Sequence, residues 1–178
     1  MKKIYYTWRD VQGSVLDIAR QMSADNWKPD YIVGITRGGL IPATLLSQYT
    51  GIKMHTLNVS LRDSDTGPES NCWMAEDAFG YDTDTETTIK CNADLKKKIL
   101  IVDDINDTGA TLAWIKNDWR SSCLPSAVDW DYVWGNNVRT AVLTDNLASK
   151  ESVDYSVWEV NKAEEDCWLV YPWEEFWR

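Results

Sequence analysis

The 178-residue sequence has little of what several common classes of protein require. Its apolar runs are all far shorter than the roughly 18 residues that cross a bilayer, and no apolar signal core follows the first methionine. We therefore expect a cytoplasmic protein without a membrane partner. Histidine occurs once, at His55. The sequence therefore argues against metal sites built from several histidines and against Ser-His-Asp catalysis.

Cysteine and basic residues are also scarce. The 18 basic residues face 28 acidic ones, and the net charge of −10 argues against a nucleic-acid partner. The four cysteines lie far apart and form no CxxC pair, so we expect reduced thiols rather than zinc ligands or disulfides. They are Cys72, Cys91, Cys123 and Cys167.

Acidic residues concentrate in one segment of the chain. Residues 62–94 hold nine acids against only Arg62 and Lys90. The surrounding segment, residues 60–95, shows no sustained apolar period and contains Gly67-Pro68. We expect a long, flexible and solvated loop or hairpin there.

Apolar periodicity predicts alternating strands and helices in the rest of the chain. Thr7, with Asp10 three residues on, is expected to cap a helix whose apolar positions run from Val11 to Met22. This order predicts an α/β fold, a single domain over 1–178 with a mainly parallel, twisted sheet flanked by helices. The expected strands cover 31–35, 53–59, 98–103, 138–144 and 153–160, the further helices cover 40–49 and 110–119, and residues 120–137 look irregular.

The most informative segment is residues 98–111. An apolar run, Ile99 to Val102, has the composition of a buried parallel strand and ends at the adjacent acids Asp103 and Asp104. Asp107 follows in a short turn with Thr108, Gly109 and Thr111. Open α/β sheets bind ligands at such strand ends, and the N-terminus of the helix that follows favours a phosphate.

A second segment has the same organisation. Residues 32–35 read as another buried strand, and a turn with Arg37, Gly38 and Gly39 follows it. The arginine offers a forked donor suited to phosphate oxygens. The two glycines allow a close approach of the backbone.

Together these two segments resemble the signatures of the type I phosphoribosyltransferases, most closely the xanthine-guanine and hypoxanthine enzymes of bacteria and archaea. The resemblance implies that Asp103 and Asp104 face the ribose hydroxyls of phosphoribosyl pyrophosphate (PRPP) and its Mg²⁺, which is held largely through substrate and water. Asp107 would lie near the base and take or hold its proton. The 5′-phosphate would be wrapped by Asp107, Thr108, Gly109, Ala110 and Thr111. The pyrophosphate loop, in which a non-proline cis peptide often occurs, would be formed by Arg37, Gly38 and Gly39.

The end of the chain carries the same resemblance. Residues 145–178, with Asp154-Tyr155 and the stretch from Asp166 to Glu174, resemble the base-binding region and small C-terminal hood of these enzymes. By matching position, Trp168 would stack on the base and the backbone of Leu169 would touch its edge. Trp173 is expected to serve packing. Ser60 matches the serine that opens the mobile catalytic loop in purine enzymes, although its neighbour there is not aromatic.

One departure leaves the identity of the base open. The purine enzymes carry a lysine after the strand that matches 138–144, where it reads the 6-oxo group, whereas this chain has Asp145 and Asn146. These side chains accept hydrogen bonds from an amino group, which favours an amino-bearing or altered base. If the base is a 6-oxopurine, another donor such as Lys150 or Lys162 must read it.

The sequence thus predicts a Mg²⁺-dependent phosphoribosyltransferase of nucleotide salvage. A nucleobase, a purine such as guanine, xanthine or hypoxanthine, would react with PRPP to give a nucleoside 5′-monophosphate and pyrophosphate. The resemblance also implies a homo-oligomer, a dimer or a tetramer. Two alternatives are a regulatory module that binds PRPP or a nucleotide on the same fold, and a phosphoribosyltransferase for an acceptor other than a 6-oxopurine.

Overall fold

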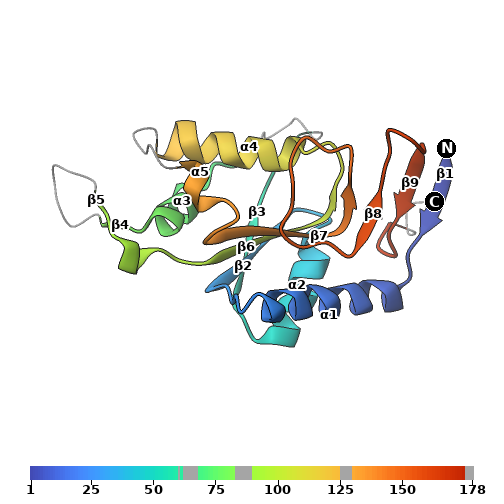
Figure 1. The fold of residues 1–178 in the computed structure, drawn as a ribbon, viewed down its shortest axis with the longest axis horizontal. Coiled ribbons are helices and arrows are strands. Elements are labelled where there is room, and N and C mark those ends of the chain that lie inside the picture. Colours follow the sequence, from blue (N-terminus) through green and yellow to red (C-terminus); the bar gives the residue numbers. More distant parts are fainter. Residues whose placement is uncertain (60, 62–67, 83–89, 125–129, 175–178) are drawn as a thin grey trace.

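A five-stranded parallel sheet forms the centre of the computed structural model, which describes residues 1–59, 61, 68–82, 90–124 and 130–174 (Figure 1). The register is parallel in every pair of neighbouring strands. The expected α/β fold is therefore confirmed. In spatial order the strands are β3 (Met54–Leu57), β2 (Tyr31–Ile35), β6 (Ile99–Asn106), β7 (Val138–Asn146) and β8 (Trp158–Val160).

Helices cover both faces of this sheet, which is why its central strands are continuously apolar. On one face lie α1 (Trp8–Ala24) and α2 (Leu40–Thr50) (Figure 1). On the other lie α3 (Cys72–Phe79), α4 (Ala110–Asp118) and α5 (Trp130–Val133). Successive strand residues alternate between the two layers, so that Ile32 and Leu100 pack under α1 and α2 while Val33 and Ile101 pack on the opposite side.

The expected N-terminal cap of α1 is confirmed. The Thr7 hydroxyl accepts a hydrogen bond from the Asp10 amide at 3.2 Å, and the Asp10 carboxylate accepts one from the Thr7 amide at 2.7 Å. Reciprocal bonds of this kind satisfy two amides that the helix itself leaves unpaired. The helix buries Val11, Val15 and Ile18 against the sheet, as the apolar spacing predicts.

The expectation of a loop over 60–95 was wrong for residues 72–79. These residues form α3, and Met74, Ala78 and Phe79 are buried between the sheet and α5. A helix of eight residues is too short for its apolar periodicity to be recognised within a polar segment of the sequence. The described part of the segment also contains the hairpin of β4 (Tyr81–Asp82) and β5 (Lys90–Cys91), which was an expected alternative, and the 3₁₀ turn η1 (Ala93–Leu95).

Residues 120–137 are also more regular than expected. A π-helical turn, η2 (Trp119–Cys123), extends α4, and α5 follows. Trp119 and Trp130 are both almost completely buried there, with ring centroids 6.1 Å apart. Their large apolar area anchors a stretch whose sequence shows no helical period.

The C-terminal hood is a two-stranded parallel sheet that the strand assignment from sequence did not include. Here β1 (Lys2–Tyr5) pairs with β9 (Cys167–Val170), at the end of the protein opposite to β4 and β5 (Figure 1). Tyr6 stacks between Trp158 of β8 and Tyr171, with centroid distances of 4.2 and 5.1 Å. No helix within the described residues is long and apolar enough to cross a membrane.

One buried hydroxyl connects the hood to the central sheet. The Tyr171 hydroxyl donates to the Asp104 carbonyl oxygen at 3.0 Å and lies 2.9 Å from the Thr144 hydroxyl. Tyr171 is 2% exposed, so these groups have little access to water. The hood is therefore attached directly to β6 and β7, at the point where β6 carries its acids.

We predict that Tyr171→Phe lowers the free energy of unfolding by about 1–2 kcal/mol, because it leaves a buried carbonyl without its donor and keeps the aromatic stack. Urea denaturation followed by circular dichroism measures this change. Tyr5→Phe, at an exposed position of β1, is the matched control and should change the midpoint little. Equal stability of Tyr171→Phe and the wild type would contradict the role given to the hydroxyl.

Candidate active site

The carboxyl ends of β2 and β6 and the start of α4 enclose an open cleft of about 990 Å³. The cleft contains most of the residues that the sequence singles out. Those that line it are Arg37, Gly38, Asp103, Asp104, Asp107, Thr108, Gly109, Ala110, Thr111 and Trp168. Gly39 and Leu169 are not among its lining residues, and Ser60 lies outside the described residues.

The turn after β2 approaches the acids of β6 more closely than any side chain would allow. A Cβ atom on Gly38 would lie 2.0 Å from Asp104 Oδ2, and one on Gly39 would lie 2.4 Å from the Val102 carbonyl oxygen. Gly39 therefore permits packing of the turn against β6. The Thr36–Arg37 peptide bond is cis, as the resemblance implies, and the Thr36 hydroxyl donates to Asn58 Oδ1 at 3.0 Å. Arg37 is exposed and lines the cleft.

Asp103 and Asp104 form a pair of adjacent, half-buried carboxylates that line the cleft. Burial raises the pKa of Asp104 to about 6, and burial together with the charge of Asp104 raises the pKa of Asp103 well above its ordinary value. The amide of Asp104 donates to Asp103 Oδ1 and the amide of Ile105 donates to Asp104 Oδ1, both at 2.9 Å. Such a pair favours a ligand that brings positive charge or hydroxyl donors.

A hard divalent cation fits this pair, because carboxylate oxygens are the ligands that Mg²⁺ prefers. In the part of the chain that the structure describes, however, no cluster of three or more His, Cys, Asp or Glu side chains could hold a metal ion. Mg²⁺ at Asp103 and Asp104 would therefore need further oxygen ligands from substrate and water.

The turn between β6 and α4, residues 107–111, opens onto the cleft at the N-terminus of a helix, which is a geometry that can bind a phosphate. Gly109 has φ +82°, and its missing Cβ leaves room for the Glu151 amide, which would otherwise lie 2.8 Å away. The nine-residue α4 begins at Ala110, so its first amides and its dipole face the cleft beside Thr108 and Thr111. The segment after β7 braces this turn, since the Lys150 amide donates to the Thr108 carbonyl oxygen at 3.3 Å.

The structure does not support reading of the base by Asp145 or Asn146. Asp145 Oδ1 accepts a hydrogen bond from Asn106 Nδ2 at 2.8 Å, and Asn146 Nδ2 donates to the Asp107 carbonyl oxygen at the same distance. Neither residue lines the cleft, and Asn146 is 5% exposed. Both residues lie at the end of β7, but their side chains bond to Asn106 and Asp107 and so support the turn after β6.

Aromatic residues from the hood form the remaining wall of the cleft. Trp168 is 43% exposed and lines it, as expected for a residue that stacks on a base. Trp173 packs parallel to Tyr171 at 4.8 Å, but it also lines the cleft, together with Glu174. Sequence reasoning assigned Trp173 to packing alone and did not find Glu174. Leu169 is buried within the hood.

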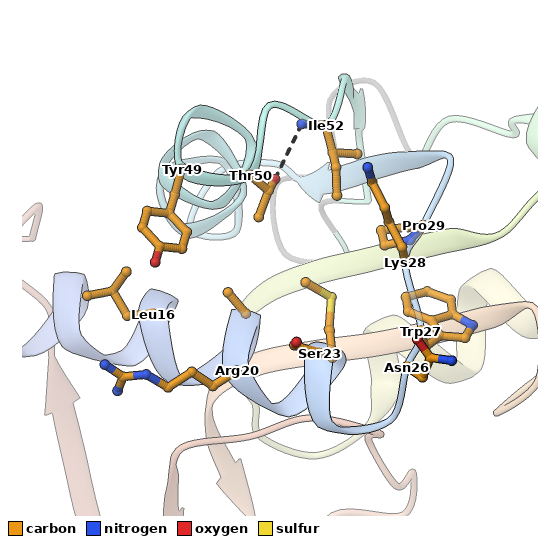
Figure 2. A pocket seen from close by; sticks show the side chains of 12 residues that line it. Leu16, Arg20, Ser23, Asn26, Trp27, Lys28, Pro29, Tyr49, Thr50 and Ile52 are labelled. Atoms are coloured by element: carbon orange, nitrogen blue, oxygen red, sulfur yellow. Dashed lines mark hydrogen bonds between the residues drawn. The ribbon is translucent and has the colours of Figure 1, made fainter.

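A second hollow, of about 520 Å³, lies between α1 and α2 (Figure 2). Figure 2 shows Leu16 and Tyr49 at one end of this groove and Trp27, Lys28 and Pro29 at the other. It contains no carboxylate among its lining residues and lies where the chain enters β2 and β3, at the amino ends of these strands. Its composition and place do not fit the chemistry of the acid pair.

We predict that Asp103→Asn stabilises the protein at pH 7.5, because it removes a desolvated charge next to Asp104. A carboxyl group whose pKa is raised by folding binds more protons in the folded state. The wild type should therefore gain stability as the pH falls from 8 toward 5, and the advantage of the variant should shrink.

Thermal unfolding across this pH range measures both effects. Asp17→Asn, on the outer side of α1, removes the same charge at the surface and serves as the control. A variant less stable than the wild type at pH 7.5 would show that Asp103 is not under electrostatic strain.

Comparison with known proteins agrees with this geometry. The family model described as "Phosphoribosyl transferase domain" matches residues 3–175. The hypoxanthine-guanine phosphoribosyltransferase of Schizosaccharomyces pombe is 25% identical over 97% of this chain and 89% of its own length. Xanthine phosphoribosyltransferase 1 of Saccharomyces cerevisiae is 21% identical over 97% of this chain and 90% of its own.

Solved structures show the same fold. The purine phosphoribosyltransferase from Pyrococcus horikoshii superimposes with a TM-score of 0.64 at 29% identity, covering 99% of this chain and 96% of that one. The xanthine-guanine-hypoxanthine phosphoribosyltransferase of Helicobacter pylori gives 0.61 at 17% identity, covering 97% and 93%. With a family model that spans nearly the whole chain and a cleft built from both signature segments, this protein belongs to the phosphoribosyltransferase family.

Proposed function

We propose that this protein transfers the 5-phosphoribosyl group from PRPP to a purine base in nucleotide salvage and depends on Mg²⁺. One observation carries the proposal: the acid pair, the phosphate turn at 107–111 and the arginine turn after β2 line a single cleft. A ribose with phosphates at both ends needs these three features together. The names of the relatives, which include hypoxanthine-guanine, xanthine and purine enzymes, support a purine as the acceptor.

The reaction develops positive charge on the ribose and negative charge on the leaving pyrophosphate, and the cleft has acidic groups for the first and Arg37 for the second. A ring nitrogen of the base forms a bond to C1 of the ribose, while the bond from C1 to the pyrophosphate oxygen breaks. The transition state is expected to resemble an oxocarbenium ion, as in glycoside cleavage. Mg²⁺ would supply positive charge to the leaving pyrophosphate. The protein needs no nucleophile of its own, in keeping with a cleft of acids, glycines and aromatics.

Each part of the cleft has a role in this reaction. Asp103 and Asp104 accept hydrogen bonds from the ribose hydroxyls and belong to the metal shell. Arg37 donates to the pyrophosphate. Asp107 takes or holds the proton that the base gives up, and it lies in the cleft within the turn that binds the 5′-phosphate.

We also propose a cytoplasmic homo-oligomer, a dimer or a tetramer. Two large aromatic residues, Tyr5 and Trp8, are 58% and 47% exposed on neighbouring elements at the start of the chain. Exposed aromatic surface of this kind is typical of contacts between proteins.

The proposal is tested with a panel of nucleobases, PRPP and Mg²⁺, with pyrophosphate release as the readout. We expect release with one or more purines, and its loss in the double variant Asp103→Asn/Asp104→Asn, because the ribose hydroxyls and the metal then lack their carboxylates. Circular dichroism checks that the double variant is folded. Tight binding of PRPP without turnover of any base would favour the regulatory alternative, and full turnover by the folded double variant would contradict the assignment of the site.

Trp168→Ala should raise the KM of every accepted base by a similar factor, roughly 5- to 150-fold, because stacking does not depend on the edge of the base. The KM of PRPP should change much less. Trp73→Ala is the matched control, since Trp73 is also 43% exposed but does not line the cleft. A loss confined to one base, or an effect of equal size in the control, would exclude stacking by Trp168.

A further inference from the structure

A buried asparagine lies directly before the phosphate turn, residues 107–111. Asn106 is the last residue of β6 and is only 3% exposed. Its Nδ2 donates to Asp145 Oδ1 at 2.8 Å and to the Glu151 carbonyl oxygen at 2.7 Å, and its Oδ1 accepts from the Ser149 hydroxyl at 3.0 Å. A side-chain amide has two N–H donors, and both are thus used within the protein. Asn106 lines the cleft but has no donor left for a ligand.

The three partners of this asparagine lie in one short segment, residues 145–151, which packs on the phosphate turn. The Lys150 amide donates to the Thr108 carbonyl oxygen at 3.3 Å. A Cβ atom on Gly109 would lie 2.8 Å from the Glu151 amide nitrogen, so the backbones of the turn and of the segment are in close contact there. The position of the segment therefore sets the position of the turn.

The same segment is attached to the helix that follows the turn. The Glu151 carboxylate lies 2.6 Å from the Lys116 ammonium of α4, and the two side chains are 23% and 29% exposed. The Lys116 ammonium also lies 5.3 Å from the centre of the Trp134 ring. Residues 145–151 are therefore attached to α4 through Glu151 and to the end of β6 through Asn106, and the phosphate turn lies between these two contacts in the chain.

The pyrophosphate side of the cleft is supported by different elements. Arg37 follows β2. Its neighbour Thr36 donates through its hydroxyl to Asn58 Oδ1 and through its amide to the Leu57 carbonyl oxygen. These contacts lead to β3 and the residue after it, not to the segment after β7. A change at Asn106 is therefore expected to affect one anion site of the cleft and not the other.

We propose that Asn106 is a positioning residue for the 5′-phosphate of the substrate. It attaches residues 145–151 to the sheet, and this segment fixes the backbone amides of the phosphate turn in the arrangement that binds the anion. This inference rests on the proposed function and adds to it a residue that acts without touching the ligand. Loss of the asparagine therefore weakens only ligands that carry a 5′-phosphate.

Calorimetric affinities of Asn106→Leu and the wild type for three ligands test the proposal: ribose 5-phosphate, PRPP with Mg²⁺ and pyrophosphate with Mg²⁺. Ribose 5-phosphate carries only the anion assigned to the phosphate turn, whereas pyrophosphate carries only the anion assigned to the arginine turn. Leucine keeps the branched shape of asparagine and removes its three hydrogen bonds. Ser149→Ala removes one partner of Asn106 and is a milder variant, which keeps the test open if Asn106→Leu does not fold.

Asn137→Leu is the matched control. Asn137 is also buried, at 8% exposure, and its Nδ2 donates to the carbonyl oxygens of Ala78 and Lys97 at 2.7 and 3.0 Å. It precedes β7 at the amino end of this strand, whereas the cleft lies at the carboxyl ends of β2 and β6. The control therefore removes bonds of the same kind at the other end of the sheet.

We expect Asn106→Leu to weaken the binding of ribose 5-phosphate and of PRPP by about 10- to 100-fold, the loss typical when a group that orients a binding residue is removed. The affinity for pyrophosphate should stay unchanged. Ser149→Ala should act in the same direction by a smaller factor. Asn137→Leu should lower the melting temperature but bind all three ligands as the wild type does.

Pyrophosphate release with nucleobases separates this inference from the proposed function. A wild type that binds ribose 5-phosphate but turns over no base contradicts the proposed transfer, and the affinities still decide on Asn106. A wild type that binds pyrophosphate but neither ribose 5-phosphate nor PRPP contradicts both. Equal losses for ribose 5-phosphate and pyrophosphate in Asn106→Leu, or the same selective loss in Asn137→Leu, would overturn the inference, because the asparagine would then serve stability alone.

Discussion

The structure depends on one electrostatic constraint, the close placement of two adjacent, half-buried carboxylates on the central strand. Desolvation raises the pKa of Asp103 and of Asp104, and the charge of Asp104 raises that of Asp103 further. The neighbouring elements are arranged around this pair. The turn after β2 reaches it only because Gly38 has no side chain, and the hood reaches it through the Tyr171 hydroxyl on the Asp104 carbonyl oxygen. A site that costs stability in this way is expected where a ligand supplies the missing charge and donors.

The remainder of the site is held by the end of β7 and the segment that follows it. Asn146 fixes the backbone of Asp107, and the Asn106 side chain donates both to Asp145 Oδ1 and to the Glu151 carbonyl oxygen. Close packing at Gly109 completes this contact. The phosphate turn is therefore supported from outside the cleft, whereas Arg37 and Trp168 are exposed within it.

Much of this arrangement could be predicted from sequence, because its determinants are local. The strands 31–35 and 98–103, the cap at Thr7 and the two signature turns each consist of neighbouring residues. Other features come from contacts that no local pattern encodes. The helix α3 is stabilised by its packing on Trp130 and the sheet, which the local sequence does not reveal. In the same way, β1 is a strand because it pairs with β9, at the other end of the chain. The ion pair of Lys162 with Asp107 has the same origin, because the two residues lie far apart in the sequence.

The central claim is that the acid pair and the two turns form one binding site for a ribose with phosphates at both ends. A crystal structure of the protein with PRPP and Mg²⁺, without a base, tests it most directly. The account predicts ribose hydroxyls within hydrogen-bonding distance of the Asp103 and Asp104 carboxylates, the 5′-phosphate at residues 107–111 and the pyrophosphate at the turn that contains Arg37. Electron density for PRPP in the groove between α1 and α2, or in the cleft without contact to the acid pair, would contradict it.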